Sequence, residues 1–143
     1  MDIYISLVFR IISISFLLIF LTMDSVRIFQ WNARNLHTNI DQFKQFLDKN
    51  SCEIICLQSV NRKASDLPFL EGFYFPPYYK VNENKNVSVA TYVKHNLVVK
   101  SINSLSGDDL QIAIETTLNN KPFKIINCYY PEGLGQANID WIE

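Results

Sequence analysis

The sequence has few of the residues that build disulfides, metal centres or charged surfaces. It holds three Cys and two His, and its 13 basic and 14 acidic residues give a formal net charge of −1. An odd number of Cys leaves one thiol over in any disulfide scheme, so we expect buried, reduced thiols at Cys52, Cys56 and Cys128. Cys52 and Cys56 lie four residues apart with no matching His or Cys pair, so they do not resemble a zinc site.

The near-zero charge and the scarcity of His limit other functional classes. No block of like charges is present, so composition gives no electrostatic argument for a nucleic-acid partner. It does not exclude one, because a nuclease can place a few Lys and Arg around an acidic, metal-bound site. His37 and His95 lie in polar loop contexts, and we interpret them as solvated loop residues rather than ligands or bases.

What the sequence does contain indicates one folded, sheet-rich domain. Its 143 residues are enough for one domain with a core and too few for two ordinary ones. Hydrophobic residues make up 48%, and ten Phe and seven Tyr suit strands and a sheet-rich core. This composition excludes a disordered tail or a fibrous repeat.

Residues 3–21 form an apolar segment broken by Arg10 and a few Ser, and three interpretations compete for it. It could be a signal peptide, although no Ala-x-Ala-like cleavage site follows. It could be an anchor, although the run after Arg10 is shorter than the roughly 20 residues of a spanning helix. We favour the third, that residues 1–22 are a spurious extension and that Met23 begins the domain, residues 23–143. The protein is then intracellular, and otherwise membrane-bound or secreted.

Apolar periodicity predicts a strand–helix–strand unit at the start of this domain. Residues 26–31 and 53–57 are mostly apolar, as in strands buried on both faces. Between them, residues 40–49 place Ile40, Phe43, Phe46 and Leu47 on one helical face, with Asn39 as the N-cap. This order implies parallel pairing of the two strands.

The rest of the chain predicts an irregular stretch followed by antiparallel strands. Residues 59–80 hold three Pro among many aromatic residues, and we expect a loop that covers a sheet edge. Residues 87–93, 97–102, 110–118 and 123–129 alternate as antiparallel strands do, with turns at 94–96 and 119–121.

Polar residues end the two apolar strands of the strand–helix–strand unit. The first strand runs into Gln30-Trp31-Asn32, the second is Ile54-Ile55-Cys56-Leu57-Gln58, and a later strand ends Asn127-Cys128-Tyr129-Tyr130-Pro131. In α/β sheets the carboxyl ends of strands gather ligands and metals. In this order, the motifs resemble the N-terminal half of the endonuclease/exonuclease/phosphatase superfamily, and above all the endonuclease domain of LINE-type (non-LTR) retrotransposons.

The resemblance implies a fold and a chemistry. The fold is α/β, the N-terminal half of a four-layered, DNase I-like sandwich with a mixed sheet and one or two helices. The chemistry is Mg²⁺-dependent phosphodiester cleavage, with DNA as the partner. Asn32 matches the family's Asn that helps bind metal and orient the phosphate, and Tyr129 matches the Tyr that contacts the scissile phosphate. The alternatives are that Asn32 only ends a strand and that Tyr129 is only a sheet aromatic.

Two departures from the family pattern argue against activity. Ser59 occupies the position of the family's Glu, the main Mg²⁺ ligand, and a neutral hydroxyl supplies little to hold a dication. The family's later segments, which carry the water-activating groups, are not in these 143 residues. We therefore expect a truncated, inactive endonuclease-like domain.

The same departures leave other partners open. If the missing half supplies the second sheet, the sheet present here would expose an apolar face. The alternative function is therefore a non-catalytic binding module that uses this face and the aromatic loop 69–79. Its partner would be a protein, a nucleic acid or the missing C-terminal half, and a membrane only if residues 3–21 are an anchor.

Overall fold

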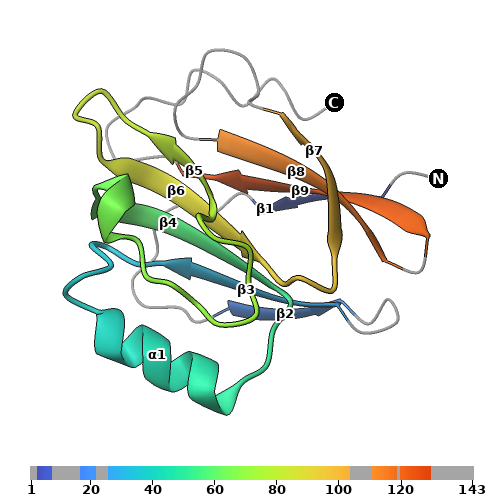
Figure 1. Cartoon of the computed structure of the whole chain (residues 1–143), viewed down its shortest axis with the longest axis horizontal. Coiled ribbons are helices and arrows are strands. Elements are labelled where there is room, and N and C mark those ends of the chain that lie inside the picture. The colour runs from blue at the N-terminus through green and yellow to red at the C-terminus, as the bar shows by residue number, and fades with distance from the viewer. Residues whose placement is uncertain (1–2, 8–16, 22–25, 104–110, 119, 130–143) are drawn as a thin grey trace.

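The computed structural model describes residues 3–7, 17–21, 26–103, 111–118 and 120–129, with only the backbone for 3–7, 17–21, 101, 103 and 118. These residues form two sheets, one α-helix and one short 3-10 helix (Figure 1). The elements are β1 (Ile3–Leu7), β2 (Leu17–Leu21), β3 (Val26–Asn32), α1 (Ile40–Lys49), β4 (Ile54–Arg62), η1 (Ala64–Asp66), β5 (Tyr78–Val81), β6 (Val87–Val93), β7 (Val98–Asn103), β8 (Gln111–Leu118) and β9 (Lys121–Cys128).

The larger sheet is mixed and contains the predicted strand–helix–strand unit. Its five strands follow the order β2-β3-β4-β6-β5. β3 and β4 are parallel, from Ile28 opposite Ile54 to Asn32 opposite Gln58. The other three pairings are antiparallel. The prediction of parallel pairing across a helix is therefore confirmed.

Helix α1 covers the face of this sheet that points away from β8 and β9 (Figure 1). Its apolar residues recur with helical spacing, and Phe43 is 1% exposed. Phe46 stacks on Phe29 of β3 with ring centroids 4.0 Å apart. Asn39 lies at the predicted N-cap position, but its side chain does not cap the helix. Its Nδ2 instead donates to the Ala33 carbonyl at 2.9 Å and ties the preceding loop to the helix start.

The second sheet corrects the expectation of an exposed apolar face. Its order is β1-β9-β8-β7, so a second sheet is already formed within this chain. Ile114 of β8 and Ile125 of β9, each 1% exposed, pack with Ile28, Ile54 and other residues of the larger sheet in one buried cluster. The apolar face is covered because the antiparallel strands predicted after residue 97 form a separate sheet that packs upon it.

The segment expected to be irregular is partly regular. β4 continues to Arg62 through a register shift against β6, η1 follows, and β5 begins at Tyr78. The loop between them buries Leu67, Leu70 and Phe73 in the cluster around α1, and so covers a sheet face rather than an edge. Phe69 and Phe75 are 68% and 50% exposed and meet edge to face at 5.7 Å.

Two stretches of the apolar N-terminal segment are strands in this structure. β1 pairs in parallel with β9, and β2 pairs antiparallel with β3. No helix among the described residues is long and apolar enough to cross a membrane. Residues 8–16 and 22–25 of the segment lie outside the described residues.

Candidate functional site at the carboxyl ends of β3, β4 and β9

The polar residue that ends β3 lies beside the first polar residues of β4. Asn32 is opposite Gln58 in the parallel register, and the Ala33 amide donates to the Gln58 carbonyl at 2.9 Å. The loop after β3 then follows β4, because the amides of Asn35 and Leu36 donate to the carbonyls of Ser59 and Val60 at 2.9 and 3.0 Å. The predicted meeting of the two strand ends is therefore formed.

Backbone strain is concentrated at this edge. Of the six described non-glycine residues with positive φ, four lie here: Arg34 (43°), Asn35 (81°), Ser59 (52°) and Asn61 (52°). Each such residue costs on the order of 1 kcal/mol or more, and such residues cluster at functional sites. At Ser59 and Asn61 the strain accompanies the register shift between Gln58 and Arg62 against β6.

Ser59 is a buried neutral group. It is 5% exposed, and its Oγ accepts a hydrogen bond from Asn61 Nδ2 at 3.2 Å. Asn32 is half-buried, and its Oδ1 accepts from the Arg34 amide at 3.4 Å. Both oxygens are thus engaged within their own loops, and neither residue carries charge.

A buried row of amides lies beneath these strand ends and joins the two sheets. Gln30 Nε2 donates to Gln58 Oε1 at 2.5 Å, and Gln58 Nε2 donates to Asn127 Oδ1 of β9 at 2.6 Å. Asn127 Nδ2 lies 3.1 Å from both Thr91 Oγ1 and the Ala90 carbonyl, and 3.2 Å from the Leu57 carbonyl. We call Gln30, Gln58, Asn127 and Thr91 the amide bridge. Its Asn and Gln members interrupt otherwise apolar strands, which is a sequence signal that our site prediction did not use.

Cys56 lies next to the amide bridge on β4. Complete burial raises the pKa of its thiol to about 12, and a hydrogen bond with Thr91 opposes that shift. Burial likewise raises the pKa of Cys52 to about 11. All three cysteines are buried, which confirms the prediction of burial.

Tyr129 lies at the same edge as Asn32 and Ser59. It follows the end of β9 by one residue and is half-buried. Two residues before it, Asn127 contacts Gln58, which lies in the middle of β4 opposite Asn32. The structure therefore places Asn32 and Tyr129 at the carboxyl ends of β3 and β9, and Ser59 beside them at the register shift within β4.

The described residues at this edge do not fit a magnesium ion. Mg²⁺ is held by carboxylates and phosphate oxygens in near-octahedral geometry, whereas Asn32 and Ser59 offer neutral oxygens. No group of three or more His, Cys, Asp or Glu side chains among the described residues could hold a metal. Glu53 cannot substitute, because it lies at the opposite end of β4, where its Oε2 accepts from the Arg27 amide at 2.5 Å.

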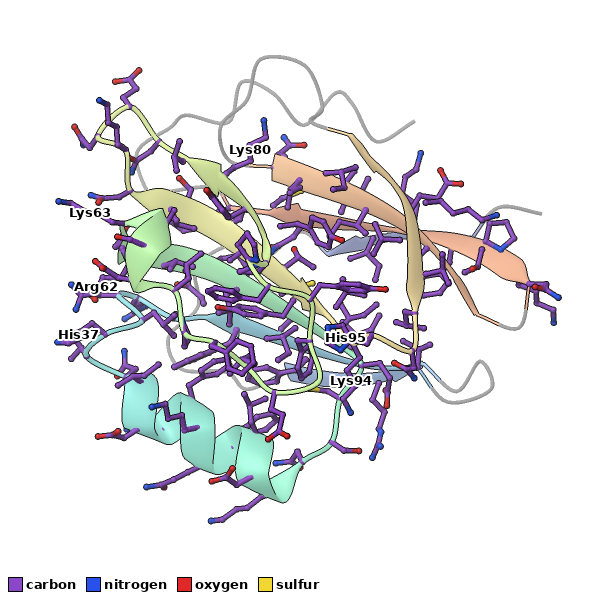
Figure 2. The ribbon with its side chains drawn as sticks, in the orientation of Figure 1. His37, Arg62, Lys63, Lys80, Lys94 and His95 are labelled. Carbon is purple, nitrogen blue, oxygen red and sulfur yellow. The ribbon has the colours of Figure 1, made fainter. Side chains whose placement is uncertain are left out.

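Basic side chains surround the edge instead. Figure 2 shows His37, Arg62 and Lys63 along the end of the molecule where β3 and β4 finish. His37 and Lys63 are exposed and Arg62 is half-buried. Arg34, in the loop beside Ser59, is also exposed. Within the described part of the chain, Arg34, Arg62 and Lys63 form no ion pair, so these three cations are available to an anion.

Comparison with known proteins identifies the fold. No protein-family model matches the sequence, and no curated protein matches it. Among solved structures, the chain is similar to the crystal structure of the Xenopus laevis APE2 catalytic domain. The TM-score is 0.58 and the sequence identity 18%, over 73% of this chain and 45% of that domain. The chain therefore spans less than half of the neighbour's length, and its fold is that of the DNase I-like α/β sandwich.

Proposed function

We propose that this chain is an endonuclease-like domain related to the endonucleases of LINE-type retrotransposons, and that it does not cleave phosphodiesters with Mg²⁺. The DNase I-like fold supports the superfamily. The strand-end motifs at Asn32, Gln58 and Tyr129 support the retrotransposon relationship. The observation that carries the loss of cleavage is the neutral, 5% exposed Ser59 at the family's carboxylate position.

The chemistry of the edge supports this interpretation. Phosphodiester hydrolysis requires that negative charge on the phosphate be neutralised and that a water be activated by a base. Asn32, Ser59 and Tyr129 can donate hydrogen bonds to a phosphate, but none of them is a base at neutral pH. The described edge can thus bind and orient a phosphodiester, but it has no base to activate the attacking water.

The proposed partner is DNA, because the basic residues at this edge can bind its phosphates. Arg34 and Arg62 can each donate two parallel hydrogen bonds to a phosphate, and Lys63 adds a point charge. Such contacts bind the backbone without reading sequence. The result is a domain that holds nucleic acid and leaves it intact.

Incubation with a supercoiled plasmid and Mg²⁺ tests both parts of the proposal, DNA binding and the absence of cleavage. We expect the purified chain to retard the plasmid and leave it supercoiled. Arg62→Ala should reduce the salt dependence of binding by about one phosphate contact, a change of roughly 0.9 in the slope of log K against log[salt]. Lys44→Ala, on the exposed face of α1, is the matched control and should leave the slope unchanged.

A second experiment measures Mg²⁺ binding directly and does not depend on cleavage. Titration with Mg²⁺ should leave the NMR signal of the Asn32 side-chain amide unmoved in the native chain. Ser59→Glu should create a weak, saturable Mg²⁺ shift at that signal, while Ser59→Ala should not. Magnesium-dependent nicking by the native chain, or a saturable Mg²⁺ shift at Asn32 without the substitution, would overturn the proposal.

A binding module would need an open sheet face, and the second sheet covers that face. Ile114 and Ile125 of the second sheet already occupy that face.

A further inference from the structure

The two apolar stretches at the N-terminus pair with two different sheets. β1 runs parallel to β9 over five residue pairs, from Ile3 opposite Phe123 to Leu7 opposite Asn127. β2 runs antiparallel to β3 over five pairs, from Leu17 opposite Gln30 to Leu21 opposite Val26. One segment thus contributes an outer strand to each layer of the sandwich (Figure 1).

Without these strands, β3 and β9 would be the unpaired edges of their sheets. An unpaired edge presents a row of free N–H and C=O groups that can recruit another chain. β3 has the composition of an interior strand, since Val26, Ile28, Phe29 and Gln30 are all buried. β5 and β7, which are edges in this structure, carry Lys80 and Lys100, whereas β3 has no Lys. Lysine is a residue with which proteins protect edges.

The pairings also flank the amide bridge. β1 ends with Leu7 opposite Asn127, and β2 begins with Leu17 opposite Gln30. Both strands therefore lie beside the residues that join the two sheets at the candidate site. Their sequences favour this conformation, because Ile3-Tyr4-Ile5 and Ile19-Phe20 consist of β-branched and aromatic residues.

We infer that residues 3–7 and 17–21 are integral strands of this domain, and that their function is to cover the edges of β9 and β3. The segment is then the intramolecular occupant of two edges that would otherwise bind a second copy of the chain. This inference is independent of the proposed function, because it concerns backbone pairing and requires neither DNA nor a metal.

Amide hydrogen exchange on the unaltered full chain tests the inference directly. Successive N–H groups of a strand point to opposite sides, so an interior strand protects consecutive amides and an edge strand protects only every second one. We expect consecutive protection over residues 27–30 of β3 and 124–127 of β9. Protection of alternate amides only, in both strands, would overturn the inference.

Paired proline substitutions give a second measurement in the full chain. In a strand, one of any two neighbouring residues points its N–H at the partner strand. Proline has no N–H, so the double substitution Ile5→Pro with Ser6→Pro removes a hydrogen bond between β1 and β9 whichever of the two residues donates it. This variant should lose alternate protection in β9 and keep it in β3. Leu18→Pro with Ile19→Pro should do the reverse.

The matched controls are Ile5→Val with Ser6→Thr, and Leu18→Val with Ile19→Val, which keep strand-forming residues and should keep all protection. Unchanged exchange in both proline variants would also contradict the inference. Sedimentation velocity should show self-association in the proline variants and not in the controls, because an uncovered edge can pair with a second copy.

Discussion

At the scale of single residues, burial sets the chemistry of Cys56. Its thiol is fully buried on β4, and desolvation raises its pKa from 9.0 to about 12. Because the raised value belongs to the folded state, the folded chain keeps this proton to higher pH than the unfolded chain does. The corresponding stability is complete below pH 9 and is lost as the pH rises toward 12.

The pH dependence of unfolding tests this shift. Between pH 9 and 11, Cys56 should make the free energy of unfolding fall as the pH rises, because the unfolded chain loses this proton and the folded chain keeps it. Urea unfolding at several pH values should therefore give a shallower decline for Cys56→Ala than for the native chain, although the variant is less stable throughout. Equal slopes for the two proteins would show that the thiol does not carry the shift.

Ser59 lies at a position that the backbone fixes without the help of its side chain. Its position is set by the β3–β4 register and by the loop bonds of Asn35 and Leu36, which depend on backbone atoms alone. The backbone arrangement therefore does not determine whether a metal can bind, whereas the side chain at position 59 does.

At the scale of elements, α1 is held by aromatic packing on one face. Phe43 is 1% exposed, and its ring centroid lies 5.7 Å from that of Trp31 and 6.4 Å from that of Phe29. The opposite face of the helix is polar and exposed, as at Lys44 and Lys49. The helix thus contributes to stability through one stripe of side chains.

Truncation of this stripe should destabilise the whole domain. Phe43→Ala removes a buried ring and leaves a cavity, at an expected cost of about 3–5 kcal/mol in the free energy of unfolding. Lys44→Ala, one residue away on the exposed face, should change stability by no more than about 0.5 kcal/mol. Denaturant unfolding of the two variants makes the comparison, and similar losses would show that α1 does not pack as described.

The sequence predicts the boundaries of some elements better than those of others. The sequence predicts the helix at residues 40–49, where it forms, because the 3.6-residue spacing of its apolar positions is a local signal. The extension of β4 to Arg62 was missed, because Ser59 and Asn61 take positive φ values that a strand pattern does not announce. β5 was missed because it is short and follows Pro76 and Pro77.

At the scale of the whole molecule, the amide bridge couples the two sheets. Asn127 is fully buried on β9, and its side chain bonds to residues of β4 and β6 in the other sheet. Removal of this side chain would leave Gln58 Nε2 and Thr91 Oγ1 without these bonds inside the core. Buried polar groups without partners are costly, so the bridge matters more than a surface hydrogen bond.

The corresponding prediction concerns the stability of both sheets together. Asn127→Ala should lower the free energy of unfolding by about 3 kcal/mol, because several buried groups lose their partner at once. Asn84→Ala, in the exposed turn between β5 and β6, should change it by less than about 0.5 kcal/mol. A loss for Asn127→Ala no larger than that of the Asn84 control, measured by urea unfolding, would mean that the sheets do not depend on the bridge.

The sequence by itself determined the local elements: the apolar strands at β3, β4 and β6, the helix at residues 40–49, and the polar residues that end the strands. These follow from the spacing of neighbouring side chains. Only the tertiary structure decided that the later strands form a second sheet, that β1 and β2 pair with β9 and β3, and that Gln30, Gln58 and Asn127 meet in one buried bridge. These contacts join residues far apart in the chain, and no local pattern specifies which distant partner a strand or an amide will find.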